Sequence, residues 1–65
     1  MENRIRELRK AKRLSQDELS KLCGVTRQTI HAIENNKYDP SLSLAFKLAK
    51  HLDTTVDALF IIGNN

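Results

Sequence analysis

The chain has 65 residues, of which 40% are hydrophobic and 29% charged, and it contains no Trp. A chain of this length is expected to form one domain, near the lower limit at which a core is stable without a metal or a disulfide. The single cysteine, Cys23, excludes an internal disulfide and is expected as a small buried group in a reducing cytosol. Because the N-terminus is charged and no apolar run approaches roughly 18 residues, the sequence predicts a cytoplasmic protein without signal peptide or membrane contact.

The net charge of +3 is concentrated near the N-terminus. Residues 1–13 carry six basic and two acidic side chains, residues 14–37 are balanced, and residues 38–65 have one acidic side chain in excess. A basic end suits a polyanionic partner, although solvated surface helices often have the same composition.

A first helix is expected close to the N-terminus. Ile5 and Leu8 are three residues apart, which places both on one helical face, with basic residues around them. Asn3 is a residue type that caps helices, so the helix is predicted from Asn3 to about Lys12.

A capping box predicts the start of the second helix. In this S-x-x-E pattern, Ser15 and Glu18 each satisfy a backbone N–H of the other. Leu19 and Leu22 are expected on the buried face, next to the cysteine. Gly24 is expected to end the helix because glycine adopts a positive φ angle without strain.

A third helix follows the glycine at once. Thr26 is a good N-cap, Val25 is placed to pack back onto Ile30, and Ile30 and Ile33 face inward at helical spacing. A tight helix–turn–helix fixes the second helix of the pair across the first at a steep angle. At about 100° per residue, the outer face then carries Arg27, Gln28, His31, Ala32 and Asn35.

This outer face is rich in side chains that read base edges in duplex DNA. Arginine forks onto guanine, glutamine pairs with adenine, and an alanine methyl contacts the thymine methyl. The helix N-terminus also presents backbone N–H groups to a phosphate. A polar helix face alone is more typical of a solvated surface, but the Gly24 turn, the capped helix before it and the ordered loop after it favour the DNA interpretation.

A fourth helix is predicted after the loop of residues 34–40. Asp39 is expected as its N-cap, with Pro40 at the first helical position. Its inner face is predicted to consist of Leu44, Ala45, Leu48, Ala49 and Leu52.

A short fifth helix with Val56 and Leu59 is expected after a cap at Thr54 or Thr55, and residues 60–62 are expected to be extended. Together these elements predict an all-α domain. Because so small a domain hardly buries the whole apolar end, the run is interpreted as part of a two-fold dimer interface, with a frayed terminus as the alternative. The proposed interface residues are Phe46, Phe60, Ile61 and Ile62.

From about Ile5 to Phe60 the sequence resembles the Cro and phage-repressor type of helix-turn-helix regulators. The resemblance rests on the motifs LSQ-x-EL, GV-T-R-Q-T-I, IE-N-x-K-x-x-P and LA-x-x-L-x-x-x-x-x-x-LF, each at the expected spacing. It implies a compact five-helix DNA-binding domain with its core over residues 4–60, the motif over about 16–35 and an apolar tail over 60–65. It also implies a transcriptional regulator without cofactor, a repressor that binds a near-palindromic operator in double-stranded DNA as a homodimer.

The resemblance also assigns roles to single residues. Base contacts fall on Arg27, Gln28 and His31. Phosphate contacts fall on Gln16, Thr26, Asn35 and Lys37. A structural ion pair between the first and third helices falls on Arg9 and Glu34.

Three positions depart from the family pattern. Ser20 replaces the usual alanine, so its hydroxyl needs a partner at a packed position. Asp53 stands where glycine is common, and a different exit from the fourth helix is expected there. His31 and Ala32 occupy variable reading positions, which leaves the target sequence open.

Other functions remain as alternatives. The same fold could serve as a protein-interaction module, such as an antitoxin or a regulatory subunit. RNA binding is disfavoured because the exposed face lacks aromatic residues for stacking. His31, His51 and Cys23 do not have zinc-site spacing, and no carboxylate pair or glycine-rich phosphate loop is present, so neither a metal site nor an enzyme is expected.

Overall fold

A computed structural model describes residues 1–62 and confirms the predicted helical domain. The helices are α1 (Ile5–Ala11), α2 (Gln16–Cys23), α3 (Arg27–Glu34), α4 (Leu42–His51) and α5 (Val56–Leu59). Two short strands, β1 (Glu2–Asn3) and β2 (Phe60–Ile61), are added to them. Residues 63–65 of the predicted apolar tail lie outside the described residues.

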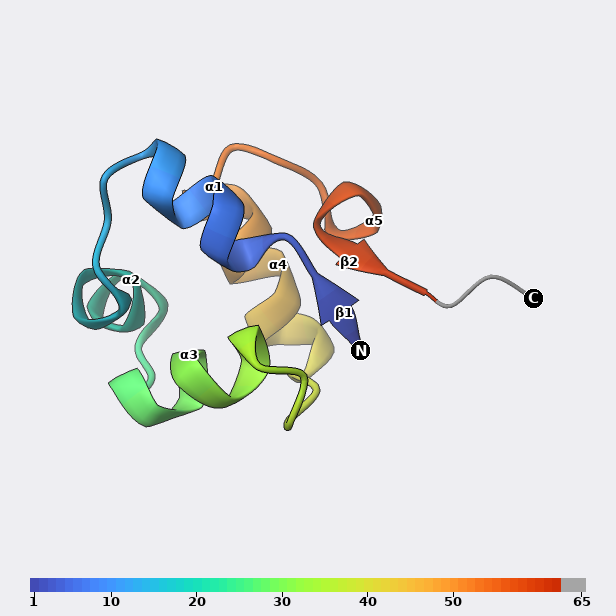
Figure 1. Cartoon of the computed structure of the whole chain (residues 1–65), viewed down its shortest axis with the longest axis horizontal. Coiled ribbons are helices and arrows are strands. Elements are labelled where there is room, and N and C mark those ends of the chain that lie inside the picture. Colours follow the sequence, from blue (N-terminus) through green and yellow to red (C-terminus); the bar gives the residue numbers. More distant parts are fainter. Residues whose placement is uncertain (63–65) are drawn as a thin grey trace.

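The helices surround α4, with α2 and α3 at one end of the molecule and α5 at the other (Figure 1). β1 and β2 form an antiparallel pair in which Asn3 is opposite Phe60 and Glu2 is opposite Ile61. The extended conformation expected after α5 is therefore confirmed for β2. Its partner β1 was not expected, because a strand of two residues carries no periodicity. The pairing brings the N-terminus beside the end of α5.

The core contains nearly all the apolar positions expected from helical spacing, and its buried hydrophobic residues are Ile5, Leu19, Cys23, Ile30, Ile33, Leu44, Ala45, Leu48, Ala49, Leu52, Leu59 and Phe60. Leu22 is the exception, because its side chain is 49% exposed. The buried face of α2 passes through Leu19, Ser20 and Cys23, and Leu22 is turned well away from that direction. The Ser20 hydroxyl has the partner it needs, since it donates to the backbone carbonyl of Asp17 at 2.7 Å.

Asn3 is not the N-cap residue of α1, because the helix begins at Ile5 and Arg4 is the N-cap residue, although Asn3 still satisfies a first-turn N–H of the helix. The Asn3 amide instead joins two helices. Its Oδ1 accepts from the backbone N–H of Ile5 at 3.1 Å, and its Nδ2 donates to the backbone carbonyl of Ile33 at 2.9 Å. A carbonyl near the end of α3 is thus satisfied by a residue about 30 positions away, a contact that local sequence does not reveal.

The prediction that Asp39 and Pro40 begin α4 is also wrong. The helix begins two residues later, at Leu42, and Ser41 is its N-cap, with its hydroxyl accepting from the Leu44 N–H at 3.1 Å. The Asp39 carboxylate is engaged elsewhere, because it accepts from the amino group of Met1 at 3.0 Å.

The exit of α4 keeps the backbone conformation that glycine would adopt, contrary to the expected difference. Asp53 has φ 56, and aspartate is among the side chains that occupy this region with least strain. Its carboxylate forms an ion pair with Lys12. The hydrogen bond and the charge of Lys12 lower the pKa of Asp53.

Candidate nucleic-acid interface

Three local signals build the turn between α2 and α3. The capping box is complete, since the Ser15 hydroxyl accepts from the Glu18 N–H at 2.9 Å and the Glu18 carboxylate accepts from the Ser15 N–H at 2.8 Å. Gly24 ends α2 with φ 72. Thr26 caps α3, because its Oγ1 accepts from the Thr29 N–H at 3.2 Å. The predicted caps are therefore confirmed, and they fix both ends of the short turn between Cys23 and Arg27.

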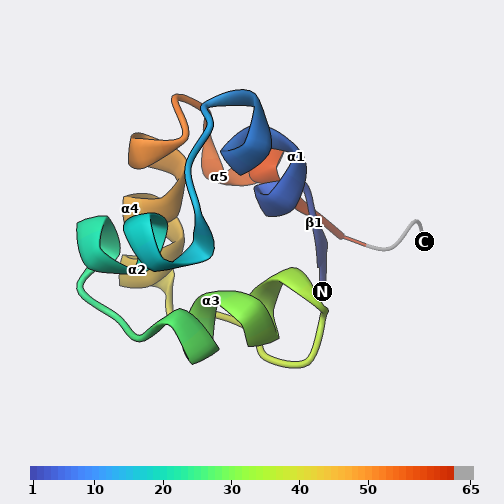
Figure 2. The same cartoon turned by 60° about the vertical axis from the view of Figure 1, so that its left-hand side comes forward.

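The inner side of α3 is fixed by Ile30 and Ile33, which are 0% and 1% exposed. The opposite side is open, and Arg27, Gln28 and His31 are exposed. In two views α3 lies at the lower edge of the molecule, and no other element covers its outer side (Figures 1 and 2). Within residues 1–62, the side chains of Arg27 and Gln28 form no hydrogen bond or ion pair to other protein groups. The first turn of α3 therefore presents free polar groups to a ligand.

A buried carboxylate joins α1, α2 and α3. The Glu34 side chain is fully buried and accepts a bidentate pair from Arg9, whose Nε and Nη2 are 2.7 and 3.2 Å from Oε2 and Oε1. Oε1 also accepts from Gln16 Nε2 at 3.1 Å and from Arg6 Nε at 3.3 Å. The remaining Arg9 nitrogen, Nη1, donates to the Leu14 carbonyl at 2.8 Å. The structure thus contains the ion pair that the resemblance implied, and Arg6 and Gln16 add further hydrogen bonds to its carboxylate.

Two opposing effects set the pKa of Glu34. Burial alone raises it, because the charged form loses its hydration. The hydrogen bonds from Arg9, Gln16 and Arg6, together with the Arg9 charge, outweigh burial and lower the pKa from its ordinary value of 4.5. Glu34 is therefore ionised at neutral pH and holds the beginning of α2 against the end of α3.

Gln16 and Asn35, two of the predicted phosphate contacts, both have protein partners. Gln16 donates one amide hydrogen to Glu34, which leaves its second N–H and its carbonyl oxygen available. Asn35 Nδ2 donates to the His31 carbonyl at 2.8 Å, and its Oδ1 accepts from Arg6 Nη2 at 3.1 Å. Their contacts with phosphate remain predictions, but the structure brings both side chains to one junction.

Of the other two predicted phosphate contacts, Lys37 has an exposed side chain, whereas the side chain of Thr26 is already hydrogen-bonded. Lys37 is exposed, and within residues 1–62 its side chain forms no hydrogen bond or ion pair, while its backbone N–H donates to the Ala32 carbonyl at 2.9 Å. The Thr26 hydroxyl is occupied by the cap and lies 3.1 Å from the Thr29 hydroxyl. A phosphate at Thr26 would therefore bind through backbone N–H groups more readily than through the side chain.

The sequence interpretation assigned no role to Arg6, which the structure places between Glu34 and Asn35. One signal was available, because Arg6 precedes Arg9 by three residues and therefore shares its helical face.

The part of the chain that the structure describes holds no group of three His, Cys, Asp or Glu side chains arranged to hold a metal. Cys23 is buried, and burial raises the pKa of its thiol, although Lys47 partly offsets the effect. No helix among residues 1–62 is long and apolar enough to cross a membrane.

Comparison with known proteins agrees with this geometry. The helix-turn-helix family model matches residues 5–59. An HTH-type transcriptional regulator of Methanocaldococcus jannaschii is 49% identical over 61 residues, which cover 94% of this chain and 92% of the relative.

Two solved structures are also similar. The restriction-modification controller protein C.AhdI from Aeromonas hydrophila has a TM-score of 0.80 and 42% identity, covering 88% of this chain and 86% of that one. The biofilm regulator SinR, solved in complex with DNA, has a TM-score of 0.75 and 35% identity, covering 82% and 86%.

The fold, with α2 and α3 joined by a tight turn, is a helix-turn-helix domain, and proteins of this class are DNA-binding transcriptional regulators rather than enzymes. The chain belongs to this helix-turn-helix family.

Proposed function

We propose that this protein is a repressor that occupies a near-palindromic operator in double-stranded DNA as a homodimer. The observation that carries the proposal is the outer face of α3, where Arg27 and Gln28 are exposed and form no bond to other groups of residues 1–62. A protein-interaction module has no need of these side chains at that position. Repression then requires no chemistry, since occupancy of the operator excludes other proteins.

In the proposed complex, α3 enters the major groove and α2 crosses the DNA backbone. Arg27, Gln28 and His31 read base edges, and the phosphate contacts of Gln16 and Lys37 set the register. SinR, which has a similar structure and was solved in complex with DNA, supports DNA as the ligand of this fold.

Selection of bound duplexes from a random pool tests the proposal. We expect one enriched sequence made of two inverted half-sites about 34 Å apart, or one turn of DNA. An enriched sequence without inverted symmetry would contradict the dimer on a palindrome. Failure to enrich any sequence at low salt would contradict specific DNA binding and favour the protein-interaction alternative.

An apolar surface on α4 and at the end of the chain supports the homodimer. Phe46 is 59% exposed, Ile61 44% and Ile62 78%, and Leu42, which the sequence interpretation did not include, is 69% exposed. Leu42 and Ile62 line one hollow of this surface, and exposed apolar groups that gather in this way usually mark an interface. Phe60 differs from this group, because it is only 8% exposed and packs mainly within its own chain.

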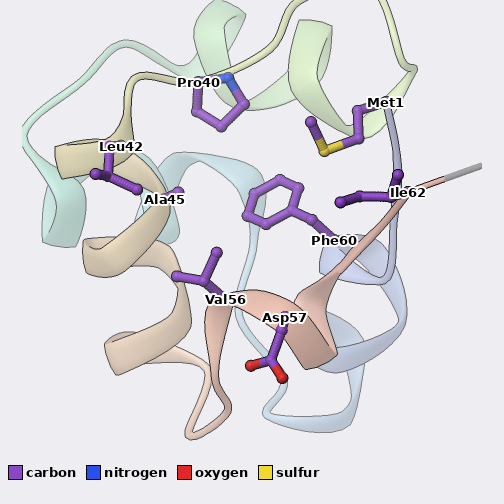
Figure 3. Close-up of a pocket in the computed structure, with 8 residues that line it drawn as sticks. All are labelled: Met1, Pro40, Leu42, Ala45, Val56, Asp57, Phe60 and Ile62. Carbon is purple, nitrogen blue, oxygen red and sulfur yellow. The ribbon is translucent and has the colours of Figure 1, made fainter.

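The surface is hollowed beside Phe60 into a cavity of about 390 Å³. Figure 3 shows the Phe60 ring at its centre, with Met1 and Ile62 on one side and Leu42 and Ala45 on the other. A second copy related by a two-fold axis would insert an apolar side chain here and receive one in return.

Point variants test this interface without damage to the core. Phe46→Asp and Ile62→Asp are each expected to convert a sedimenting dimer into a monomer, because a carboxylate would be desolvated in the interface. Leu22→Asp is the matched control, since Leu22 is exposed to a similar degree on α2, at the other end of the molecule. Dimers of unchanged stability in both interface variants would refute the proposed surface.

A further inference from the structure

We infer that Arg6 binds a phosphate of the DNA backbone, as a contact supplied by α1 between those of Gln16 and Asn35. The inference rests on the proposed function, because it adds a contact to the same interface. It is based on the Arg6 guanidinium, which the protein holds in one orientation while some of its N–H donors have no partner within residues 1–62.

The orientation of Arg6 is fixed by two hydrogen bonds. Nε donates to Glu34 Oε1 at 3.3 Å, and Nη2 donates to Asn35 Oδ1 at 3.1 Å. A guanidinium has five N–H donors in one plane, so three remain without a partner within residues 1–62. The Arg6 side chain is 50% exposed, so a ligand can approach it from solvent. A planar fork held in this way matches the geometry of a phosphate.

The charges of Glu34, Arg9 and Arg6 also favour binding of an anion at Arg6. Glu34 carries one negative charge and is already matched by Arg9, which makes the shorter, bidentate contact and is itself only 10% exposed at its side chain. Arg6 therefore adds a positive charge that no second carboxylate in its hydrogen-bonded surroundings neutralises. An exposed uncompensated cation at a junction of three helices favours a polyanion.

The neighbours of Arg6 indicate which polyanion. Gln16 donates to the same Glu34 oxygen as Arg6, so the two side chains lie side by side at the start of α2. On the other side Arg6 contacts Asn35, the residue after α3. Both neighbours are proposed phosphate contacts, and a backbone that reaches both must pass over Arg6. Glu34 acts here as a positioning residue, since it holds Arg6 and Gln16 through one oxygen.

The salt dependence of DNA affinity distinguishes a phosphate contact from structural support. Each neutralised phosphate contributes a slope of about 0.9 to the fall of log affinity with log salt concentration. Arg6→Gln should therefore flatten the slope by about 0.9 and weaken binding at 50 mM salt roughly tenfold, on selected and random duplexes alike. Arg4→Gln is the matched control, because it removes the same charge from the beginning of the same helix, where Arg4 is 44% exposed and pairs with Glu7.

A weakened Arg6→Gln complex with the slope of the wild type would show that Arg6 only supports the fold, and would overturn the inference. An unchanged affinity and slope would also overturn it. If Arg6→Gln melts too early to be assayed, Arg6→Lys takes its place, because lysine keeps the charge without the fork. That variant should keep the wild-type slope but bind several-fold more weakly, and full wild-type affinity would contradict the role of the fork.

Failure of this inference is separable from failure of the proposed function. If the wild type selects an operator but Arg6→Gln behaves like Arg4→Gln, only the Arg6 contact is lost. If the wild type selects no sequence, the proposed function itself is withdrawn.

Discussion

Replacement of Glu34 by glutamine tests the junction of α1, α2 and α3. The Glu34 side chain is fully buried and accepts four hydrogen bonds, two from Arg9 and one each from Arg6 and Gln16. Glutamine has the same shape, but it carries no charge and presents an NH₂ group where one oxygen accepted. In either orientation of the amide, donors face donors, and Arg9 is left without a counterion.

The expected loss is large for so small a domain. Breaking a buried ion pair by removal of one partner costs about 3–5 kcal/mol. A 65-residue domain has a total free energy of unfolding of about 3–10 kcal/mol, estimated from about 0.05–0.15 kcal/mol per residue. Glu34→Gln should therefore bring the protein close to the limit of folding at 25 °C.

Urea titration followed by helical circular dichroism measures this loss. The midpoint of Glu34→Gln should fall strongly, while the slope of free energy against urea concentration stays constant. Glu7→Gln is the control, since Glu7 is exposed and pairs with the exposed Arg4 three residues before it, and its midpoint should stay close to that of the wild type. The double variant Arg9→Met, Glu34→Leu should recover part of the loss, because it leaves no buried charge unpaired. Equal midpoints for Glu34→Gln and Glu7→Gln would refute the reasoning.

Two further predictions concern pH and the turn glycine. Because the folded state lowers the pKa of Glu34 below 4.5, its contribution is complete above that value and is lost as the pH falls through the folded pKa. The melting temperature of the wild type should fall as the pH is lowered below 4.5, less steeply in Glu34→Gln, and parallel curves would contradict the assignment. Gly24→Ala should cost about 1 kcal/mol from the positive φ alone, since an added Cβ meets no atom within 4 Å, and Gly24→Asn should cost less in the same urea titration.

The features that sequence predicted well are local ones. The capping box at Ser15, the cap at Thr26 and the stop at Gly24 each depend on residues within one helical turn, so their spacing in the sequence is enough to define them. The apolar periodicity of α4 is equally local and predicted its buried face.

The features that sequence predicted wrongly depend on distant partners. Asp39 is a good cap by residue type, but in the fold it binds the amino group of Met1, and Ser41 caps α4. Asn3 is drawn to the end of α3 in the same way. The spacing of Arg6 and Arg9 places both on one helical face, but the role of Arg6 depends on Glu34, which is 28 residues away and which that spacing does not identify.

The central claim is that α3 holds Arg27 outward to read a base. The most direct test compares the affinity of the wild type and of Arg27→Ala for the selected duplex and for a random duplex, at one salt concentration. Arg27→Ala should lose about 1–3 kcal/mol, or about 5- to 150-fold, on the selected duplex and relax the preference at one base pair. An equal loss on both duplexes would show that Arg27 supplies only charge, and would contradict the account.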